Sequence, residues 1–226
     1  MAYTRAGTEP DGRRERWRGH REARRAELIA AVITAVQESG AGIGMDDIAR
    51  MSGIAKPVFY RYFADKADLY LAVGRTVAET VVEEITAAIN RQSNPEAMLA
   101  AGVDAYLRRV EASPELYRFV AHPPIDRPAV TDPLSDYATV VGLHVSRVIG
   151  DFLGDAGLDS GAAEPWGFGL VGMVRAAGER WLDHPIISRR ALSAHLTGLA
   201  WSGLAQVTEG ARLPDASASR LRAVED

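Results

Sequence analysis

Apolar side chains recur at helical spacing along most of the 226-residue chain, and no segment alternates apolar and polar residues as a half-buried strand does. The first well-bounded pattern predicts a helix over residues 21–39, followed by Gly40, a residue type common directly after a helix. Its expected buried positions are Leu28, Ile29, Val32 and Val36. The pattern as a whole predicts an all-α protein.

Two much shorter helices are predicted next, over about 45–51 and 56–63, with a tight turn at Gly53 between them. Pro57 is acceptable in the second of these helices because it lies in the first turn, where an amide hydrogen is not needed. Side chains from both helices and from the turn are expected to form a small internal core: Ile48, Ala49, Ile54, Phe59 and Phe63.

A long helix is predicted from Asp65 to about Asn90. Asp65 is a good N-cap, and Asp68 three residues later forms a capping box with aspartate in place of the usual glutamate. The apolar positions continue without a break through Leu69, Val73, Val77, Val81 and Ile85. Such a helix can connect two subdomains.

Beyond Pro95 the pattern predicts a larger helical bundle, with helices over about 95–112, 114–121, 134–153, 161–182 and 188–208. The segment 122–133 contains four prolines and cannot be regular helix. We therefore expect a flexible Arg-rich arm at 1–20, a first helical domain at 21–66, a second at 67–210 and a flexible tail at 211–226.

The two short helices have the arrangement of a helix-turn-helix unit. In such a unit the second helix stands out from the body, so that its first side chains reach base edges in the major groove. Lys56 can donate to guanine O6 or N7, and Val58 can pack on a thymine methyl group. Tyr60 is expected near the rim, and phosphate contacts are expected from Arg61, Tyr62 and Lys66.

This stretch, Met45–Leu69, resembles the DNA-binding domain of TetR-family regulators. The resemblance covers about residues 22–72. It rests on the Ile48-Ala49 pair, the turn at Gly53, the Tyr60-Arg61-Tyr62-Phe63 element and the Phe-x-x-Lys-x-x-Leu spacing of residues 63–69. It implies that positions contacting DNA are Lys56, Pro57, Val58, Tyr60, Tyr62 and Lys66, to which we add Gly44, Met45 and Arg61 as candidates.

Two departures from the family pattern concern hydroxyl groups. Gly44 stands where the family usually has Thr or Ser, and Ala55 and Val58 stand where it usually has Ser and Thr in the recognition helix. Glycine is a tolerable N-cap, within a few tenths of a kcal/mol of serine, whereas alanine is a poor one. The DNA sequence read by this chain therefore cannot be inherited from relatives that carry those hydroxyls.

The resemblance also implies that the second domain binds a small effector and forms a homodimer. Candidate effector-binding residues are Tyr106, Phe119, Tyr137, His144, Phe168, Val171 and Arg175. Each of these is also explained as ordinary helical core, and Arg175 as the i,i+4 partner of Glu179. For the dimer face we expect two helices with small-residue grooves, carrying Gly167, Gly169, Gly172 and Gly178 on one and Leu196, Leu199, Ala200, Gly203 and Leu204 on the other.

The charge distribution suits a protein that places one end on a polyanion. The net charge is −4, but residues 1–75 carry 13 Lys and Arg against 10 Asp and Glu, while residues 76–226 carry 13 against 20. The chain has no cysteine, which excludes a disulfide framework and a thiol nucleophile and agrees with a cytoplasmic location. No secretory signal or stretch long enough to cross a membrane is recognisable, so we expect no membrane partner.

Enzyme signatures are missing: the five histidines show no paired metal-ligand spacing, and there is no phosphate loop or nucleophile elbow, so no cofactor is expected. Glu111 and Glu115 lie one helical turn apart, which a solvated helix face explains. The sequence therefore predicts a ligand-responsive transcriptional regulator, a repressor released from a palindromic double-stranded DNA operator by a small hydrophobic effector. The alternatives are a helical carrier or enzyme without DNA binding, and an effector-independent activator.

Overall fold

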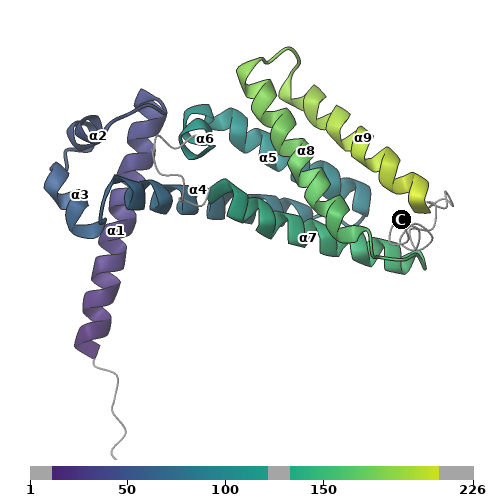
Figure 1. The fold of residues 1–226 in the computed structure, drawn as a ribbon, viewed down its shortest axis with the longest axis horizontal. Helices are drawn as coiled ribbons and strands as arrows, with labels where there is room; N and C mark the ends of the chain where they lie inside the picture. Colours follow the sequence, from purple (N-terminus) through teal and green to yellow (C-terminus); the bar gives the residue numbers. More distant parts are fainter. Residues whose placement is uncertain (1–11, 122–132, 209–226) are drawn as a thin grey trace, which may run out of the picture.

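The computed structural model describes the backbone of residues 12–121 and 133–208, and the side chains of residues 16–121 and 138–206. Within these residues the fold is all-α, as predicted (Figure 1). The helices are α1 (Gly12–Ser39), α2 (Met45–Ser52), α3 (Lys56–Tyr62), α4 (Lys66–Ile89), α5 (Pro95–Ala112), α6 (Pro114–Ala121), α7 (Pro133–Asp155), α8 (Ala163–Asp183) and α9 (Arg189–Thr208).

Most of these boundaries lie within two residues of the predicted ones, but the start of α1 does not. The predicted helix begins at residue 21, whereas α1 begins at Gly12. Residues 12–20, predicted as part of a flexible arm, therefore continue α1 as a helix that projects from the body (Figure 1). The rest of that arm, the proline-rich segment and the C-terminal tail lie outside the described residues.

The three-helix unit predicted from the sequence packs against the first half of α4 and against α6. Its core contains Ile48, Phe59 and Phe63, each at most 2% exposed, as well as the four predicted positions of α1. Ile54 is partly buried and packs against the same cluster. The helical spacing of these apolar residues therefore identified most of the core of the unit, whereas Ala49, also predicted there, is half-buried and not among the residues of the cluster.

The turns and caps hold α3 at a fixed position. Gly53 ends α2 in the left-handed conformation, with φ 66°, which disfavours residues that have a Cβ atom. Asp65 caps α4 by accepting a hydrogen bond from the amide of Asp68 at 2.9 Å. In return the Asp68 carboxylate accepts from the amide of Ala64, the residue before the N-cap, at 3.0 Å.

α4 runs from the three-helix unit into the larger bundle, where α5, α7, α8 and α9 complete the fold (Figure 1). α7 and α8 pack very closely at Gly167, because a Cβ atom there would lie 2.7 Å from the backbone nitrogen of Ser146 and 2.9 Å from the carbonyl oxygen of Gly142. A Cβ atom at Gly178 would lie 3.1 Å from the ring of Tyr106. These two glycines, expected on a dimer face, therefore serve packing within the subunit, whereas Gly169 and Gly172 face open space.

Candidate DNA-reading surface and apolar cavity

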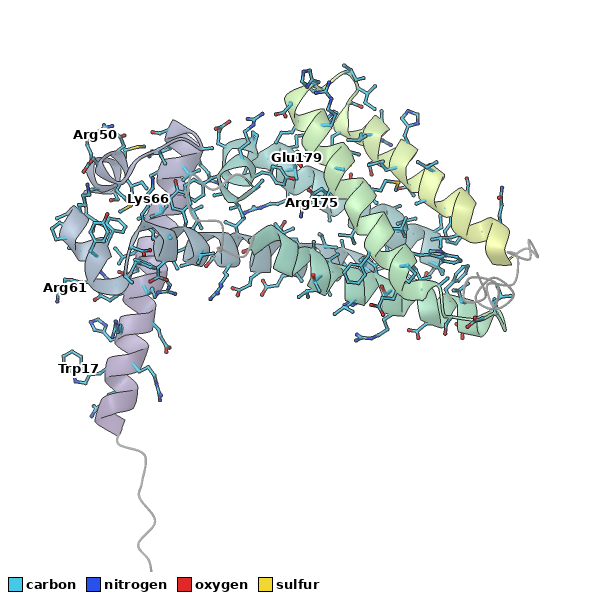
Figure 2. The ribbon with its side chains drawn as sticks, viewed as in Figure 1. Trp17, Arg50, Arg61, Lys66, Arg175 and Glu179 are labelled. Carbon is cyan, nitrogen blue, oxygen red and sulfur yellow. The ribbon has the colours of Figure 1, made fainter. Side chains whose placement is uncertain are left out.

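The outer side of α3 presents a mixed polar and aromatic surface. Pro57, Tyr60 and Arg61 are exposed, and Arg61 points away from the bundle in Figure 2. Val58 and Tyr62 are only partly exposed and pack against the core of the unit. The structure therefore makes Tyr60 a more prominent surface residue than the sequence predicted, and Val58 and Tyr62 less prominent ones.

Lys56, the first residue of α3, forms an ion pair with Asp46 in the first turn of α2. The Lys56 Nζ atom lies 2.8 Å from the Asp46 carboxylate. The hydrogen bond to Asp46 holds the pKa of Lys56 above its usual value, so this side chain is positively charged. Sequence reasoning assigned Asp46 only to the helix dipole and missed this pair, which joins residues ten positions apart across the turn.

The first turns of α2 and α3 lack side-chain caps. Gly44 and Ala55 occupy the N-cap positions, and neither has a side chain that can accept a hydrogen bond from the helix. Met45 is 7% exposed and belongs to the core, so its side chain cannot reach a partner outside the protein. Its backbone amide, at the positive end of α2, remains suitable for a phosphate oxygen.

The base of α3 is fixed by cation contacts to aromatic rings. The Arg25 guanidinium lies 4.7 Å from the ring centre of Phe63 and forms an ion pair with Asp68. The Lys66 ammonium lies 5.3 Å from the ring centre of Tyr70. Lys66 is the first residue of α4, so its charge lies close to the end of α3.

A cavity with a volume of about 150 Å³ lies among α4, α5, α7, α8 and α9. Its lining is almost wholly apolar, and Arg175 is the one charged residue among those that line it. Tyr106, Val171 and Arg175, predicted as effector-binding residues, do line it. Further residues of the lining, contributed by four of the five helices, are Ala78, Gly102, Val148, Phe152 and Trp201.

A shallower groove between α7 and α8 shares Arg175 and Val171 with this cavity. Phe168 and Glu179 also line the groove, so Phe168 lies outside the inner cavity and not within it. Figure 2 shows Arg175 and Glu179 together on α8. Arg175 therefore stands where the apolar cavity meets a more polar surface.

Besides Phe168, two predicted effector-binding residues, Phe119 and His144, do not line the cavity. Phe119 is 1% exposed in the core of the three-helix unit, where its ring stacks on Tyr70 at 4.2 Å between ring centres. His144 lines neither the cavity nor the groove, and its buried Nε2 atom has no hydrogen-bond partner among the described residues. The side chain of Tyr137 lies outside the described residues. Helical spacing marked Phe119 and His144 as positions of a helical core without showing which core they enter.

α6 connects the cavity wall to the three-helix unit, which we also call the DNA-reading unit. Tyr106 of the cavity wall donates a hydrogen bond to the hydroxyl of Tyr117 on α6 at 3.4 Å, and burial raises the pKa of Tyr106, which keeps it protonated at neutral pH. Two residues earlier on α6, the Glu115 carboxylate accepts from the amide of Ala41, in the loop between α1 and α2, at 2.9 Å. That bond, and then Arg118, hold the pKa of Glu115 below its usual value.

The predicted explanation of Glu111 and Glu115 as a solvated helix face is therefore incomplete. Glu111 pairs with Arg189 of α9 at 2.8 Å, whereas Glu115 reaches the loop before α2. Arg118 adds a contact from α6 to Asp183 at the end of α8. No signal in the sequence marks these contacts, because each joins residues that lie more than 60 positions apart.

No group of three or more potential metal ligands occurs among the described residues. In the same part of the chain, no helix combines the length and the apolar character needed to cross a bilayer.

Comparison with family models identifies two segments. Residues 28–73 match the model described as bacterial regulatory proteins of the tetR family. Residues 84–216 match the model described as a tetracyclin repressor-like C-terminal domain. The two matched segments correspond to the three-helix unit with the start of α4, and to the larger bundle.

Relatives of known sequence are regulators of the same type. The chain is 34% identical to an uncharacterized HTH-type transcriptional regulator of Mycobacterium tuberculosis, over 88% of this chain and 85% of that protein. It is 29% identical to the HTH-type transcriptional activator FasR of Mycolicibacterium smegmatis, over 83% of this chain and 85% of that protein.

Solved structures show the same fold at low sequence identity. A transcriptional regulator from Pseudomonas aeruginosa superimposes with a TM-score of 0.68 at 15% identity, over 83% of this chain and 93% of that one. The regulator FadR of Bacillus subtilis, solved in complex with stearoyl-CoA, superimposes with a TM-score of 0.67 at 15% identity, over 79% of this chain and 98% of that one.

Proposed function

The chain belongs to the TetR family of bacterial transcriptional regulators, and from that premise we propose that it is a homodimer whose binding to a palindromic operator is weakened by a hydrophobic effector. The observation that carries the proposal is the apolar cavity beside α4, the helix that also begins directly after the recognition helix α3. The two halves of the proposal, DNA binding and effector release, are supported by different residues.

Support for operator reading comes from the surface of α3. Lys56 and Tyr60 stand at the outer side of the helix, with Arg61 exposed and Lys66 at the start of α4. Lys56 is the candidate for contact with guanine, and the other three for contacts with phosphates. The backbone amides that follow Gly44 and Ala55 complete the proposed interface, because no side-chain cap occupies them.

The chemistry of the effector follows from the lining of the cavity. An apolar cavity of about this volume is not well hydrated and accepts apolar molecules. Arg175 at its edge can pair with a carboxylate or a phosphate. A molecule with an apolar chain and an anionic head therefore fits both features. The neighbouring FadR structure contains stearoyl-CoA, a ligand of this kind.

Two connections can carry the effect of the effector to α3. The first is α4, which lines the cavity at Ala78 and is capped by Asp65 directly after the DNA-reading unit. The second is α6, which Tyr106 contacts from the cavity wall and which Glu115 ties to the loop before α2. A coupling of about 1–3 kcal/mol between the two sites is enough for regulation.

The proposed dimer face consists of the outer sides of α8 and α9. Leu199 is 67% exposed and Phe168 is 37% exposed, although both are apolar. Gly169, Gly172 and Gly203 beside them have no other atom within 4 Å of the position that a Cβ atom would take. Exposed apolar side chains next to open glycines allow two helices of a second subunit to approach closely.

Repression is the first candidate for the direction of regulation, as predicted from the sequence. A second candidate, activation, is favoured by one observation, the 29% identity to a protein named as a transcriptional activator. Release from DNA would raise transcription in the first case and lower it in the second. A reporter gene placed behind the operator, with and without the gene for this protein, distinguishes them.

Operator binding is tested with duplexes selected in vitro from a random-sequence library by the full-length protein. We expect a palindromic consensus, and a slope of log affinity against log salt that reflects several phosphate contacts. Lys56→Ala should cost roughly 1–3 kcal/mol and relax the sequence preference at one position of each half-site. Failure to enrich any duplex at low salt would overturn the proposal in favour of a carrier.

Effector release is tested with a panel of saturated fatty acids and acyl-CoA thioesters added to the preformed operator complex. Val148 lines the cavity, so Val148→Phe should fill part of it and abolish release while operator binding persists. Leu143→Phe is the matched control, because Leu143 lies on the same helix and is 49% exposed. Equal behaviour of the two variants would show that the cavity is not the effector site.

A further inference from the structure

We propose that residues 12–21, the α1 extension, form a second DNA-contacting surface that binds the duplex beside the half-site read by α3. The inference rests on the proposed operator binding. It adds to the surface of α3 a second surface of this chain that contacts the same DNA. It concerns a segment that the sequence pattern assigned to a flexible arm and that the structure shows as helix.

The described side chains of the α1 extension, those of residues 16–21, make no contribution to the core. The side chains of residues 16–23 are all exposed, and the first buried residue of α1 is Leu28. At a rise of about 1.5 Å per residue, the ten residues of the extension span roughly 15 Å. Figure 1 shows this part of α1 leaving the body on the side of the DNA-reading unit, away from α8 and α9. Among the described side chains of this part of α1, none has a packing role within the subunit.

The composition of the α1 extension fits a polyanion. It contains five arginines and one glutamate, a balance of +4, as well as His20. Neither Arg18 nor Arg21 forms an ion pair within the part of the chain that the structure describes. One turn further along α1 the arginines do form ion pairs, Arg24 with Glu27 and Arg25 with Asp68. Arg18 and Arg21 therefore lie farther from the body than these two paired arginines and are available to an external anion.

Trp17 adds a second and independent feature. Its side chain is 69% exposed, which is unusual for the largest apolar residue type on a helix without packing partners. In Figure 2 Trp17 points to the same side of the molecule as Arg61, the exposed arginine of α3. A tryptophan can pack its ring on deoxyribose and donate from Nε1 to a phosphate. Trp17 and the arginines thus supply both contacts that a DNA backbone accepts.

The geometry places these contacts outside the half-site. Base pairs are spaced by about 3.4 Å, so a helix of roughly 15 Å spans about four of them. The side chains of α3 occupy the major groove of the half-site itself. The α1 extension then lies along the neighbouring phosphates, where contacts add affinity without adding base specificity.

Other occupants fit the α1 extension less well. A second copy of the extension would bring two clusters of charge +4 together. A membrane-surface helix needs a continuous apolar face, and Trp17 is the only large apolar residue between Gly12 and Arg21. Duplex DNA satisfies the charge and tolerates a single aromatic contact.

The test compares two duplexes that contain the same selected operator, one trimmed to the two half-sites and one with about six further base pairs at each end, enough for the roughly four that the extension spans. The variants are the double substitution Arg18→Ala with Arg21→Ala, and the single substitution Trp17→Ala. The matched control is Arg147→Ala with Arg190→Ala, which removes the same charge from exposed positions on α7 and α9. Thermal unfolding should be unchanged in all variants, since none of these side chains enters the core.

We expect the wild-type protein to bind the longer duplex on the order of tenfold more tightly, and the arginine variant to lose that preference with a salt slope reduced by about two per subunit. Trp17→Ala should lose part of the preference, and the control should keep all of it. An arginine variant that still prefers the longer duplex, or that loses affinity equally for both duplexes, would overturn the inference. Binding to anionic lipid vesicles is measured in parallel. A variant that loses only vesicle binding would overturn the inference as well. Failure of the wild-type protein to bind either duplex would instead count against the proposed function.

Discussion

Asp46 of α2 and Lys56 of α3 lie 2.8 Å apart as an ion pair across the turn of the DNA-reading unit. The Asp46 carboxylate is 85% exposed and the Lys56 side chain is 40% exposed, so both can change partner when DNA arrives. To contact a base edge, the Lys56 ammonium group must either leave the Asp46 carboxylate or bind the carboxylate and the base at the same time. The pair therefore holds Lys56, the residue proposed to read a base, in a set orientation and would compete with DNA for it.

We expect Asp46→Asn to bind the selected operator more tightly than the wild-type protein, by a few-fold to roughly tenfold, because Lys56 no longer has to leave a carboxylate to contact DNA. Asp47→Asn is the control, since Asp47 pairs with Arg50 and not with Lys56. Titration of labelled operator at two salt concentrations measures both effects. Weaker binding by Asp46→Asn would mean that orientation of Lys56 outweighs competition for it.

Glu115→Ala should destabilise the protein by about 1 kcal/mol, because the partly buried amide of Ala41 loses its hydrogen-bond acceptor. It should also reduce the effect of a bound effector on operator affinity, because α6 is then no longer tied to the loop before α2. Glu111→Ala, which removes a carboxylate that pairs with α9, is the control. Urea unfolding gives the first quantity, and operator titration with and without effector gives the second. Unchanged coupling in Glu115→Ala would assign the transmission to α4 alone.

The ion pairs of Asp104 predict a loss of stability in acid. Burial alone would raise the pKa of Asp104, but hydrogen bonds from Arg189 and Arg108 outweigh it and hold that pKa below its usual value. A lowered folded-state pKa means that the stabilisation is complete above the unfolded value of about 3.9 and is lost as the pH falls below it.

The free energy of unfolding should therefore fall as the pH drops below about 4 in the wild-type protein, and fall less steeply in Asp104→Asn. Asp151→Asn serves as the control, because Asp151 is an exposed carboxylate on α7. Urea unfolding at several pH values checks the difference. Parallel curves for wild type and Asp104→Asn would contradict it.

Gly167→Ala should destabilise the subunit by roughly 1–3 kcal/mol, since the added methyl group meets the backbone of Ser146 and must push α7 and α8 apart. Gly154→Ala, where nothing beyond the neighbouring residues and the backbone of its own helix lies within 4 Å of the added methyl group, should be neutral or stabilising by up to about 1 kcal/mol. Thermal unfolding distinguishes the two. A dimer that dissociates in Gly167→Ala without loss of subunit stability would restore that glycine to the interface.

The sequence by itself determined the helices and the DNA-reading unit. Ile48, Phe59 and Phe63 are identified as core by local spacing, because residues three or four apart on one helix share a face whatever lies opposite. The turn at Gly53 and the cap at Asp65 are equally local, since each is made by residues only a few positions apart. The length of α1 was missed because its first turns are polar on nearly all sides and carry no apolar period.

Tertiary structure alone decided which apolar residues meet. Phe119 and Tyr106 both lie at apolar positions that recur with the helical period. Phe119 nevertheless joins the core of the DNA-reading unit, whereas Tyr106 lines the cavity. The pairing of Asp46 with Lys56 and of Glu115 with the loop before α2 depends on how separate helices lie against each other. The hydrophobic period predicts that a side chain is buried. The residues that this side chain contacts are determined by packing between elements far apart in the chain.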